Sequence, residues 1–183
     1  MIIKKLTFVT GNKSKAEQLG RHLDFPVMQQ KVDVREIQSL NLREIVEEKV
    51  KEAYKIVKGP VLVEDTSLIF TSLNNLPGPL IKWFLNSLGN DGLCKIIDGY
   101  KNRKAIAEVC FGLYDGKEIL FFEGKMEGTI SKKPFGESGF GWDPIFIPKG
   151  YKKTWGQMSV EEQVKTSMRK IGLKKLEKFL KEI

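Results

Sequence analysis

The order of hydrophobic and polar residues predicts alternating strands and helices. Residues 61–63 (Val-Leu-Val) form a continuous apolar run, which is typical of a strand buried on both faces. Residues 41–58 carry apolar side chains at intervals of three and four, and this spacing predicts a helix that stops at Gly59-Pro60. Its apolar positions are Leu42, Ile45, Val46, Val50, Ala53, Ile56 and Val57.

Turn residues and periodicity predict the other elements. Residues 5–10 favour a first strand, residues 13–23 a helix, and residues 27–34 a second strand or extended segment. Two short helices are expected at 80–88 and 91–98, separated by Gly89-Asn90. Residues 104–114 and 117–125 favour a hairpin across Asp115-Gly116, and residues 127–131 allow the sheet to continue. From Ser159 onward the pattern is helical, with Glu162 placed to complete a capping box.

Two adjacent acids, Glu64 and Asp65, directly follow the buried run at 61–63. Acids at the carboxyl end of a buried strand lie where open α/β sheets form their ligand crevices. The pair therefore indicates a metal or general-base site. The alternative is a strand edge whose acids are solvated.

The first strand, the turn at Gly11-Asn12 and the helix after it form a second candidate site. This arrangement directs backbone N–H groups and a helix N-terminus toward an anion. Asn12, Lys13 and Lys15 add donors and positive charge. A Walker loop is absent, so an ordinary strand–helix turn is an equal alternative.

Lys49 is anomalous on the helix at 41–58. At 100° per residue the apolar side chains form one arc, and Lys49 falls almost at its centre. A lysine on the core side of a helix extends its amine to solvent or binds an anion. Both readings remain open, and a phosphate would be such an anion.

Residues 134–148 form a glycine-rich loop that contains Phe140 and Trp142. Exposed rings near basic residues suit stacking on a nucleobase, which contributes about 1–3 kcal/mol per base. The alternative is a loop folded over the core with its rings inward. Further along, Ser167 and Arg169 precede the apolar stripe of the last helix, where they could face a cleft.

Composition narrows the function classes. The chain has 183 residues, enough for one domain or one domain with two lobes, and 41% hydrophobic and 30% charged residues suit a soluble globular protein. No segment approaches the roughly 18 apolar residues of a membrane span, and strand-like sequence follows Met1 without a signal peptide. Cys94 and Cys110 are too few for a disulfide framework, so a cytoplasmic protein with reduced thiols is expected.

The net charge and the single histidine narrow the possible function classes further. The net charge of +8 favours polyanions, either nucleic acid or a nucleotide, although a lysine-rich terminal helix is usually a solvated face. His22 is the one histidine, which excludes a zinc site rich in histidine. Acid–base chemistry is expected to fall to carboxylates or lysines.

Four motifs follow one another along the chain: Thr-Gly-Asn-Lys-Ser-Lys at 10–15, Glu-Asp-Thr-Ser-Leu at 64–68, Leu-Pro-Gly-Pro-Leu-Ile-Lys-Trp-Phe-Leu at 76–85 and Phe-Gly-Trp-Asp-Pro at 140–144. With these motifs in this order, the chain closely resembles the inosine triphosphate pyrophosphatases. The resemblance covers essentially the whole chain. It implies an elongated α/β fold, with a long mixed β-sheet and two lobes flanking a central active-site cleft, as a single domain over 1–183.

The resemblance also implies the activity and a catalytic set. The activity is Mg²⁺-dependent cleavage of non-standard purine triphosphates, such as those of inosine and xanthosine, to the monophosphate and pyrophosphate, by a homodimer. Glu36 and Asp65 would bind Mg²⁺, directly or through water, with Glu64 beside them. Asp65 would also be the base for the attacking water. The catalytic residues would thus be Asp65, Glu64 and Lys49.

Substrate contacts follow from the same resemblance. The residues that would hold the triphosphate are Thr10, Asn12, Lys15 and Lys49. The residues that would pack around the base or read its edge are Phe140, Trp142, Asp143, Ser167 and Arg169. Lys82 would be a further contact near the nucleotide.

Three positions near the C-terminus and one near the N-terminus depart from the family pattern. Gln163, Val164 and Met168 stand where relatives usually carry lysine, asparagine and histidine, and Gln18 replaces a usual glutamate. Met168 cannot donate a hydrogen bond to a 6-keto oxygen. Base preference is therefore the least determined property, and two alternatives remain: a pyrophosphatase with another base preference, and a non-catalytic module that binds nucleic acid through its basic face.

Overall fold

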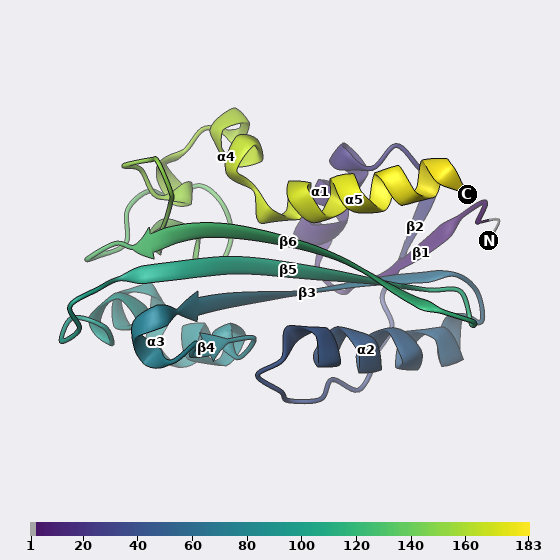
Figure 1. Ribbon diagram of the computed structural model, residues 1–183, viewed down its shortest axis with the longest axis horizontal. Helices are drawn as coiled ribbons and strands as arrows, with labels where there is room; N and C mark the ends of the chain where they lie inside the picture. Colours follow the sequence, from purple (N-terminus) through teal and green to yellow (C-terminus); the bar gives the residue numbers. More distant parts are fainter. Residues whose placement is uncertain (1–2) are drawn as a thin grey trace. The chain divides into compact units, whose positions relative to one another are not determined.

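Residues 3–183 form a mixed sheet of seven strands with helices around it, described by a computed structural model (Figure 1). The structure does not describe five side chains of α1: Lys13, Ser14, Gln18, Arg21 and His22. The predictions made above for Lys13, Gln18 and His22 therefore concern side chains outside the described part of the chain. The strands are β1 (Leu6–Val9), β2 (Val27–Gln30), β3 (Val61–Phe70), β4 (Pro77–Gly78), β5 (Lys104–Tyr114), β6 (Ile119–Ile130) and β7 (Phe146–Pro148). The helices are α1 (Lys13–His22), α2 (Leu42–Val57), α3 (Ile81–Lys95), α4 (Val160–Thr166) and α5 (Met168–Glu182), with 3₁₀ turns η1 (Thr71–Leu73), η2 (Asp143–Ile145) and η3 (Trp155–Gln157).

The sheet contains both parallel and antiparallel pairs. The strand order is β2-β1-β3-β5-β6-β7, and β4 pairs with β3. β1 is parallel to β2 and β3, whereas β4 and β7 are antiparallel to their neighbours. The predicted α/β fold with a long mixed sheet is confirmed.

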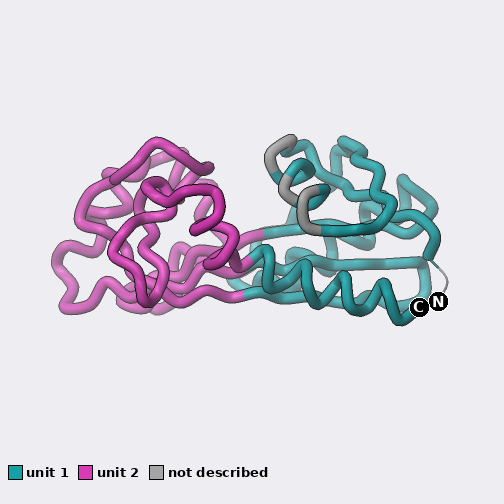
Figure 2. Tube along the Cα trace, turned by 90° about the horizontal axis from the view of Figure 1, so that it is seen from above, with its two compact units in different colours: residues 1–65, 109–124, 169–183 teal, residues 66–108, 125–168 magenta. Residues whose placement is uncertain are grey.

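The chain divides into two compact units, coloured in Figure 2. Unit 1 comprises the chain up to Asp65, Val109–Gly124 and Arg169–Ile183, and unit 2 comprises Thr66–Glu108 and Lys125–Met168. β3, β5 and β6 each contribute residues to both units. No helix in residues 3–183 is both long enough and apolar enough to span a membrane.

Unit 1 packs helices on both faces of its strands. α2 lies on one side and α5 on the other (Figure 1). A Cβ at Gly112 of β5 would lie 2.6 Å from Val46 of α2, and one at Gly172 of α5 would lie 3.0 Å from Phe111 of β5. Phe111 and Gly112 are consecutive and therefore face opposite sides of the sheet, so glycine permits close helix packing on each face.

Unit 2 is organised by an aromatic cluster and an arginine. Trp142, Phe146 and Trp155 pack together, with ring centroids 4.5–5.9 Å apart. Arg103 donates to the carbonyls of Cys94, Ile130 and Ser131, at 2.6–2.8 Å. Through these hydrogen bonds Arg103 connects the end of α3 to the end of β6 within unit 2.

The helix predictions are confirmed, and so are the hairpin and the capping box. α1 and α2 match the predicted spans within one residue, β5 and β6 form the hairpin, and Ser159 caps α4 with Glu162. The two short helices predicted at 80–98 form α3, which is interrupted at Gly89 with φ +64°. Both cysteines are buried and free.

One predicted segment is a strand only in part, and one strand prediction was wrong at its end. Of the strand or extended segment predicted at 27–34, residues 27–30 form β2, and β2 stops there because its pairing partner β1 ends at Val9. β3 does not end at the acids but continues to Phe70. The acids interrupt the apolar run without ending the strand, because β3 remains paired with β5 and later with β4.

Candidate active site

Glu64 is a buried carboxylate held by two cations. It lies in β3 with its side chain 2% exposed. The Nε of Arg169, at the start of α5, donates to Glu64 Oε1 at 2.8 Å. The Nζ of Lys15, in α1, lies 3.4 Å from the same oxygen. We call Lys15, Glu64 and Arg169 the Glu64 cluster; it joins three elements of unit 1.

The electrostatics of the cluster keep Glu64 charged. Burial alone raises the pKa of this carboxyl, but the neighbouring charges of Arg169 and then Lys15 outweigh burial, so the pKa lies below its ordinary value. With one acid and two cations the cluster carries a net charge of +1. It is therefore suited to bind an anion.

Lys49 is the centre of a second cluster in unit 1. Its Nζ lies 2.6 Å from Glu36 Oε1 and 3.6 Å from Asp65 Oδ2, and its side chain is 12% exposed. Desolvation lowers the pKa of Lys49, but the charges of Asp65 and Glu36 outweigh it and raise the pKa overall. The amine thus meets anions, as one of the two readings of its helix position proposed, although these anions are carboxylates. Lys49, Glu36 and Asp65 form the Lys49 cluster, with a net charge of −1.

The start of α1 lies beside these clusters in sequence and in the sheet. The amide of Lys15 donates to Asn12 Oδ1 at 3.2 Å, and the amide of Asn12 donates to Thr10 Oγ1 at 3.1 Å. Asn12 is therefore the N-cap of α1. β1 and β3 are parallel, with Phe8 paired to Leu62, so both strands run in the same direction toward Thr10 and Glu64. A ligand crevice is expected at the carboxyl end of such a strand.

The donor set of the Lys49 cluster fits a hard divalent cation. Magnesium binds one or two carboxylates together with water and phosphate oxygens, and it needs no histidine. Glu36 and Asp65 offer two carboxylates around one amine. Among the described residues there is no group of three or more His, Cys, Asp or Glu side chains arranged as a metal site, so a metal here would depend on substrate or water for its other ligands.

Five further predicted residues belong to unit 2: Lys82, Phe140, Trp142, Asp143 and Ser167. Lys82 is exposed near the start of α3, and Ser167 follows the last residue of α4. Asp143 Oδ2 accepts a hydrogen bond from the amide of Phe140 at 2.6 Å. This bond fixes the glycine-rich loop between them.

The two rings of this loop differ in exposure. Trp142 is 9% exposed and lies in the aromatic cluster with Phe146 and Trp155, as the inward alternative expected. Phe140 is 57% exposed, as the stacking hypothesis expected. A contact of either ring with a base stays a prediction, but in this structure the accessible face belongs to Phe140.

The structure describes the surroundings of two residues that depart from the family pattern, Gln163 and Met168. Gln163 donates from Nε2 to the carbonyl of Trp155 at 2.6 Å and so supports the aromatic cluster. Met168 is 5% exposed. An apolar side chain suits that burial, whereas a histidine there would need a hydrogen-bond partner.

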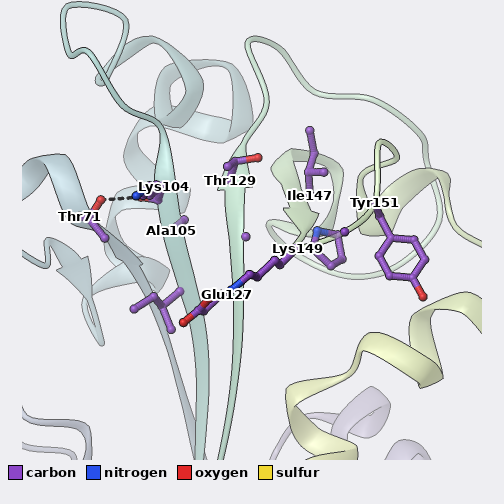
Figure 3. Close-up of a pocket in the computed structure, with 12 residues that line it drawn as sticks. Thr71, Lys104, Ala105, Glu127, Thr129, Ile147, Lys149 and Tyr151 are labelled. Atoms are coloured by element: carbon purple, nitrogen blue, oxygen red, sulfur yellow. Dashed lines mark hydrogen bonds and ion pairs between the residues drawn. The ribbon is translucent and has the colours of Figure 1, made fainter.

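Unit 2 also contains a pocket of about 510 Å³ on the strands β5, β6 and β7 (Figure 3). Its lining includes Ala105, Thr129 and Ile147, and Glu127 and Lys149 form an ion pair of 2.6 Å in it. None of the residues predicted to bind substrate or metal lines this pocket.

The members of both clusters were identified from sequence, and Glu36 was grouped with Asp65, but the ion pairs within the clusters were not predicted. Arg169 was expected to read a base edge, and its contact with Glu64 spans 105 positions in sequence. No local pattern signals such a contact. The anomaly of Lys49 on its helix was the one signal that a buried charge required partners.

Comparisons with known proteins identify the family of the chain. The model of the Ham1 family matches residues 6–179. An inosine triphosphate pyrophosphatase of Schizosaccharomyces pombe is 43% identical over 183 residues, which are 98% of this chain and 96% of that protein. The enzyme of the same name from Emericella nidulans is 43% identical over 184 residues and covers 97% of each chain.

Solved structures share the fold. A HAM1 protein from Coxiella burnetii superposes with a TM-score of 0.88 at 22% identity, covering 99% of this chain and all of that one. A dITP/XTP pyrophosphatase from Mycobacterium abscessus gives a TM-score of 0.77 at 24% identity. The match covers 94% of this chain and 98% of that one. The match over residues 6–179 and the 43% identity of full-length relatives confirm the resemblance drawn from the four motifs: the chain belongs to the Ham1 family of inosine triphosphate pyrophosphatases.

Proposed function

We propose that the protein hydrolyses non-standard purine nucleoside triphosphates, those of inosine and xanthosine and their deoxy forms, to the monophosphate and pyrophosphate, with Mg²⁺ as cofactor. The observation that carries the proposal is the pair of clusters in unit 1, one with net charge +1 and one with net charge −1. A triphosphate needs cations and its metal needs carboxylates. Relatives at 43% identity carry the name of this activity.

The triphosphate is assigned to the cluster with excess positive charge and to the start of α1. Lys15 supplies a cation, and Thr10 and Asn12 supply polar groups at a helix N-terminus. Lys49 joins them as a second amine, since it lies between the carboxylates that would hold Mg²⁺. When bound, Mg²⁺ would neutralise phosphate charge at Glu36 and Asp65.

Hydrolysis to pyrophosphate requires water to attack the α-phosphorus. The water oxygen forms the new bond to that phosphorus, the bond from it to the bridging oxygen breaks, and pyrophosphate leaves. Asp65 accepts the proton of the water, and Lys49, whose Nζ lies 3.6 Å from Asp65 Oδ2, holds the carboxylate in place. Glu64 acts next to them by holding Lys15.

Recognition of the base is assigned to unit 2. Phe140, with its exposed ring, and Trp142 supply aromatic surface, and Asp143 and Ser167 supply polar groups for the base edge. Lys82 is a further contact. We also propose that both units serve one catalytic domain and that the protein works as a homodimer, as the resemblance implies. A location in the cytoplasm is proposed from its two free cysteines.

The test is a panel of nucleoside triphosphates incubated with the protein and Mg²⁺, with pyrophosphate and phosphate measured separately. Inosine and xanthosine triphosphates should release pyrophosphate fastest. Pyrophosphate release from pyrimidine triphosphates instead would support another base preference. Absence of pyrophosphate from every nucleotide would contradict the function.

Asp65→Asn separates catalysis from binding. Loss of the general base should lower kcat by about 100-fold or more, since general base catalysis contributes 10²–10⁴-fold. Asp24→Asn, an exposed aspartate of unit 1, is the matched control and should leave kcat unchanged. A nucleic-acid-binding module would instead show salt-sensitive polynucleotide binding that survives Asp65→Asn.

A further inference from the structure

The Glu64 cluster gives one carboxylate oxygen to two cations. Arg169 Nε lies 2.8 Å and Lys15 Nζ 3.4 Å from the same Oε1. The side chains of Arg169 and Lys15 are 15% and 16% exposed, and that of Glu64 is 2% exposed. The two cations therefore share one buried anion, and each changes how strongly the other is held.

We propose that Arg169 is a positioning residue for the triphosphate end of the substrate: by neutralising Glu64 it leaves the charge of Lys15 available to phosphate, whichever base the nucleotide carries. The proposal rests on the proposed function and deepens it. It differs from the role that the family resemblance implies for Arg169, which is to read the edge of the base.

Burial holds Arg169 in the ion pair with Glu64. If Arg169 moved away, Glu64 would remain buried with only Lys15, the more distant of its two cations. A buried carboxylate that loses a hydrogen-bonded partner is strongly destabilised. Arg169 is therefore held at β3 by Glu64, within unit 1.

The consequence for Lys15 follows from charge. Without Arg169, Lys15 and Glu64 form a neutral pair, and the amine is drawn to the carboxylate instead of to an incoming phosphate. With Arg169 present, one positive charge remains in excess. Glu64 and the triphosphate thus compete for the Lys15 amine. Arg169 neutralises Glu64 and so favours binding of the amine to the triphosphate.

Inorganic tripolyphosphate tests this idea because it has the phosphates but no base. Its binding is measured by calorimetry without divalent metal, so that no turnover interferes. Arg169→Gln should weaken binding about 10-fold or more, as expected for loss of a charge-assisted bond, and Arg169→Lys should restore part of the affinity. In kinetic assays Arg169→Gln should lower kcat/KM by one common factor for inosine, xanthosine and adenosine triphosphates.

A second variant shows whether Arg169 acts through Glu64. In the Glu64→Gln background Lys15 no longer faces a carboxylate, so Arg169→Gln should then have little further effect on tripolyphosphate binding. The double variant also removes both members of the ion pair, which avoids leaving a buried charge unpaired. An equal loss in both backgrounds would mean that Arg169 attracts phosphate directly, and would overturn the positioning role.

Arg43→Gln is the matched control. This arginine of α2 also belongs to unit 1, but its guanidinium lies 4.1 Å from the ring centre of Phe121. Its replacement should leave tripolyphosphate binding unchanged.

The remaining outcomes separate the two proposals. The inference would be overturned if Arg169→Gln left tripolyphosphate binding unchanged and altered the ratios of kcat/KM among nucleotides with different bases. Arg169 would then be assigned to recognition of the base. Wild-type protein that binds tripolyphosphate in the expected pattern but hydrolyses no nucleotide would refute the function and support the positioning. Wild-type protein that does not bind tripolyphosphate would overturn the positioning.

Discussion

Lys49 stands between two carboxylates that would also bind a divalent cation. In the free protein its amine contacts Glu36 and Asp65 and so competes with a metal for them. Lys49→Met should therefore tighten binding of Mg²⁺ in the absence of nucleotide, because two negative charges then face the site without compensation. Turnover should nevertheless fall by about 100-fold, since the triphosphate loses a cation in the transition state.

Calorimetric titration with Mg²⁺ and steady-state kinetics measure these two effects separately. Lys51→Met is the matched control, because Lys51 lies on the same helix and pairs with Glu47 and Glu48. It should change neither quantity. Weaker binding of Mg²⁺ in Lys49→Met would contradict the competition between amine and metal.

Glu64 makes the stability of the protein depend on acid pH. Its pKa in the folded state lies below the ordinary value of 4.5, so its charge contributes stability that is complete above that pH. The contribution is lost as the pH falls from 4.5 through the folded pKa. Glu64→Gln should therefore flatten the fall of the unfolding free energy below pH 4.5, measured by urea denaturation at several pH values. Glu161→Gln, an exposed residue of α4, should retain the wild-type dependence, and an unchanged slope in Glu64→Gln would refute the assignment.

Single residues could be recognised from sequence when their chemistry conflicted with a local pattern. Lys49 interrupted an apolar arc, and the acids at 64 and 65 followed an apolar run, so each became a candidate site residue. Their partners could not be derived in this way. The bond of Arg169 to Glu64 joins residues 105 positions apart, and such a contact depends on the sheet and on α5 being folded.

At the scale of elements, α1 and α2 begin in the same way and can be compared directly. Each has an asparagine N-cap with φ −95° and ψ 107°, Asn12 for α1 and Asn41 for α2. Replacing either by alanine should cost about 1 kcal/mol of unfolding free energy, because one amide at the helix start loses its acceptor. Asn12→Ala should in addition raise KM for the nucleotide, since the start of α1 is assigned to the triphosphate.

Urea denaturation and steady-state kinetics on the two variants check this prediction. Asn41→Ala serves as the control for a purely structural effect, and its KM should match that of the wild type. Equal KM values for both variants would remove the start of α1 from the proposed triphosphate site.

Elements with a strong local signal were predicted well, and their ends less well. The periodicity of α2 and the Asp115-Gly116 turn are properties of neighbouring residues, so sequence was sufficient for them. The extent of β3 depends on its neighbours, because pairing with β5 and β4 carries the strand past its acids to Phe70. Sequence alone contains no local sign of that pairing.

At the scale of the whole molecule, the proposed substrate contacts fall into two groups. Residues of unit 1 are assigned to the triphosphate, which all nucleotides share, and residues of unit 2 to the base. Variants of unit 1 should therefore change kcat/KM by a common factor, whereas variants of unit 2 should change the ratios among bases. Phe140 offers the most direct test, because its ring is 57% exposed while that of Trp142 is buried in the aromatic cluster.

Phe140→Ala should raise KM for inosine triphosphate by about 10-fold, the loss expected when one stacking contact of 1–3 kcal/mol is removed. Binding of tripolyphosphate should stay at the wild-type value, because no base is involved. Tyr100→Ala, which removes another exposed ring of unit 2, should alter neither measurement. Weaker tripolyphosphate binding in Phe140→Ala would show that the loop acts on the phosphates or on the fold of the site. An unchanged KM would instead exclude stacking by this ring, and Trp142 would then have to leave the aromatic cluster for the loop to contact a base at all.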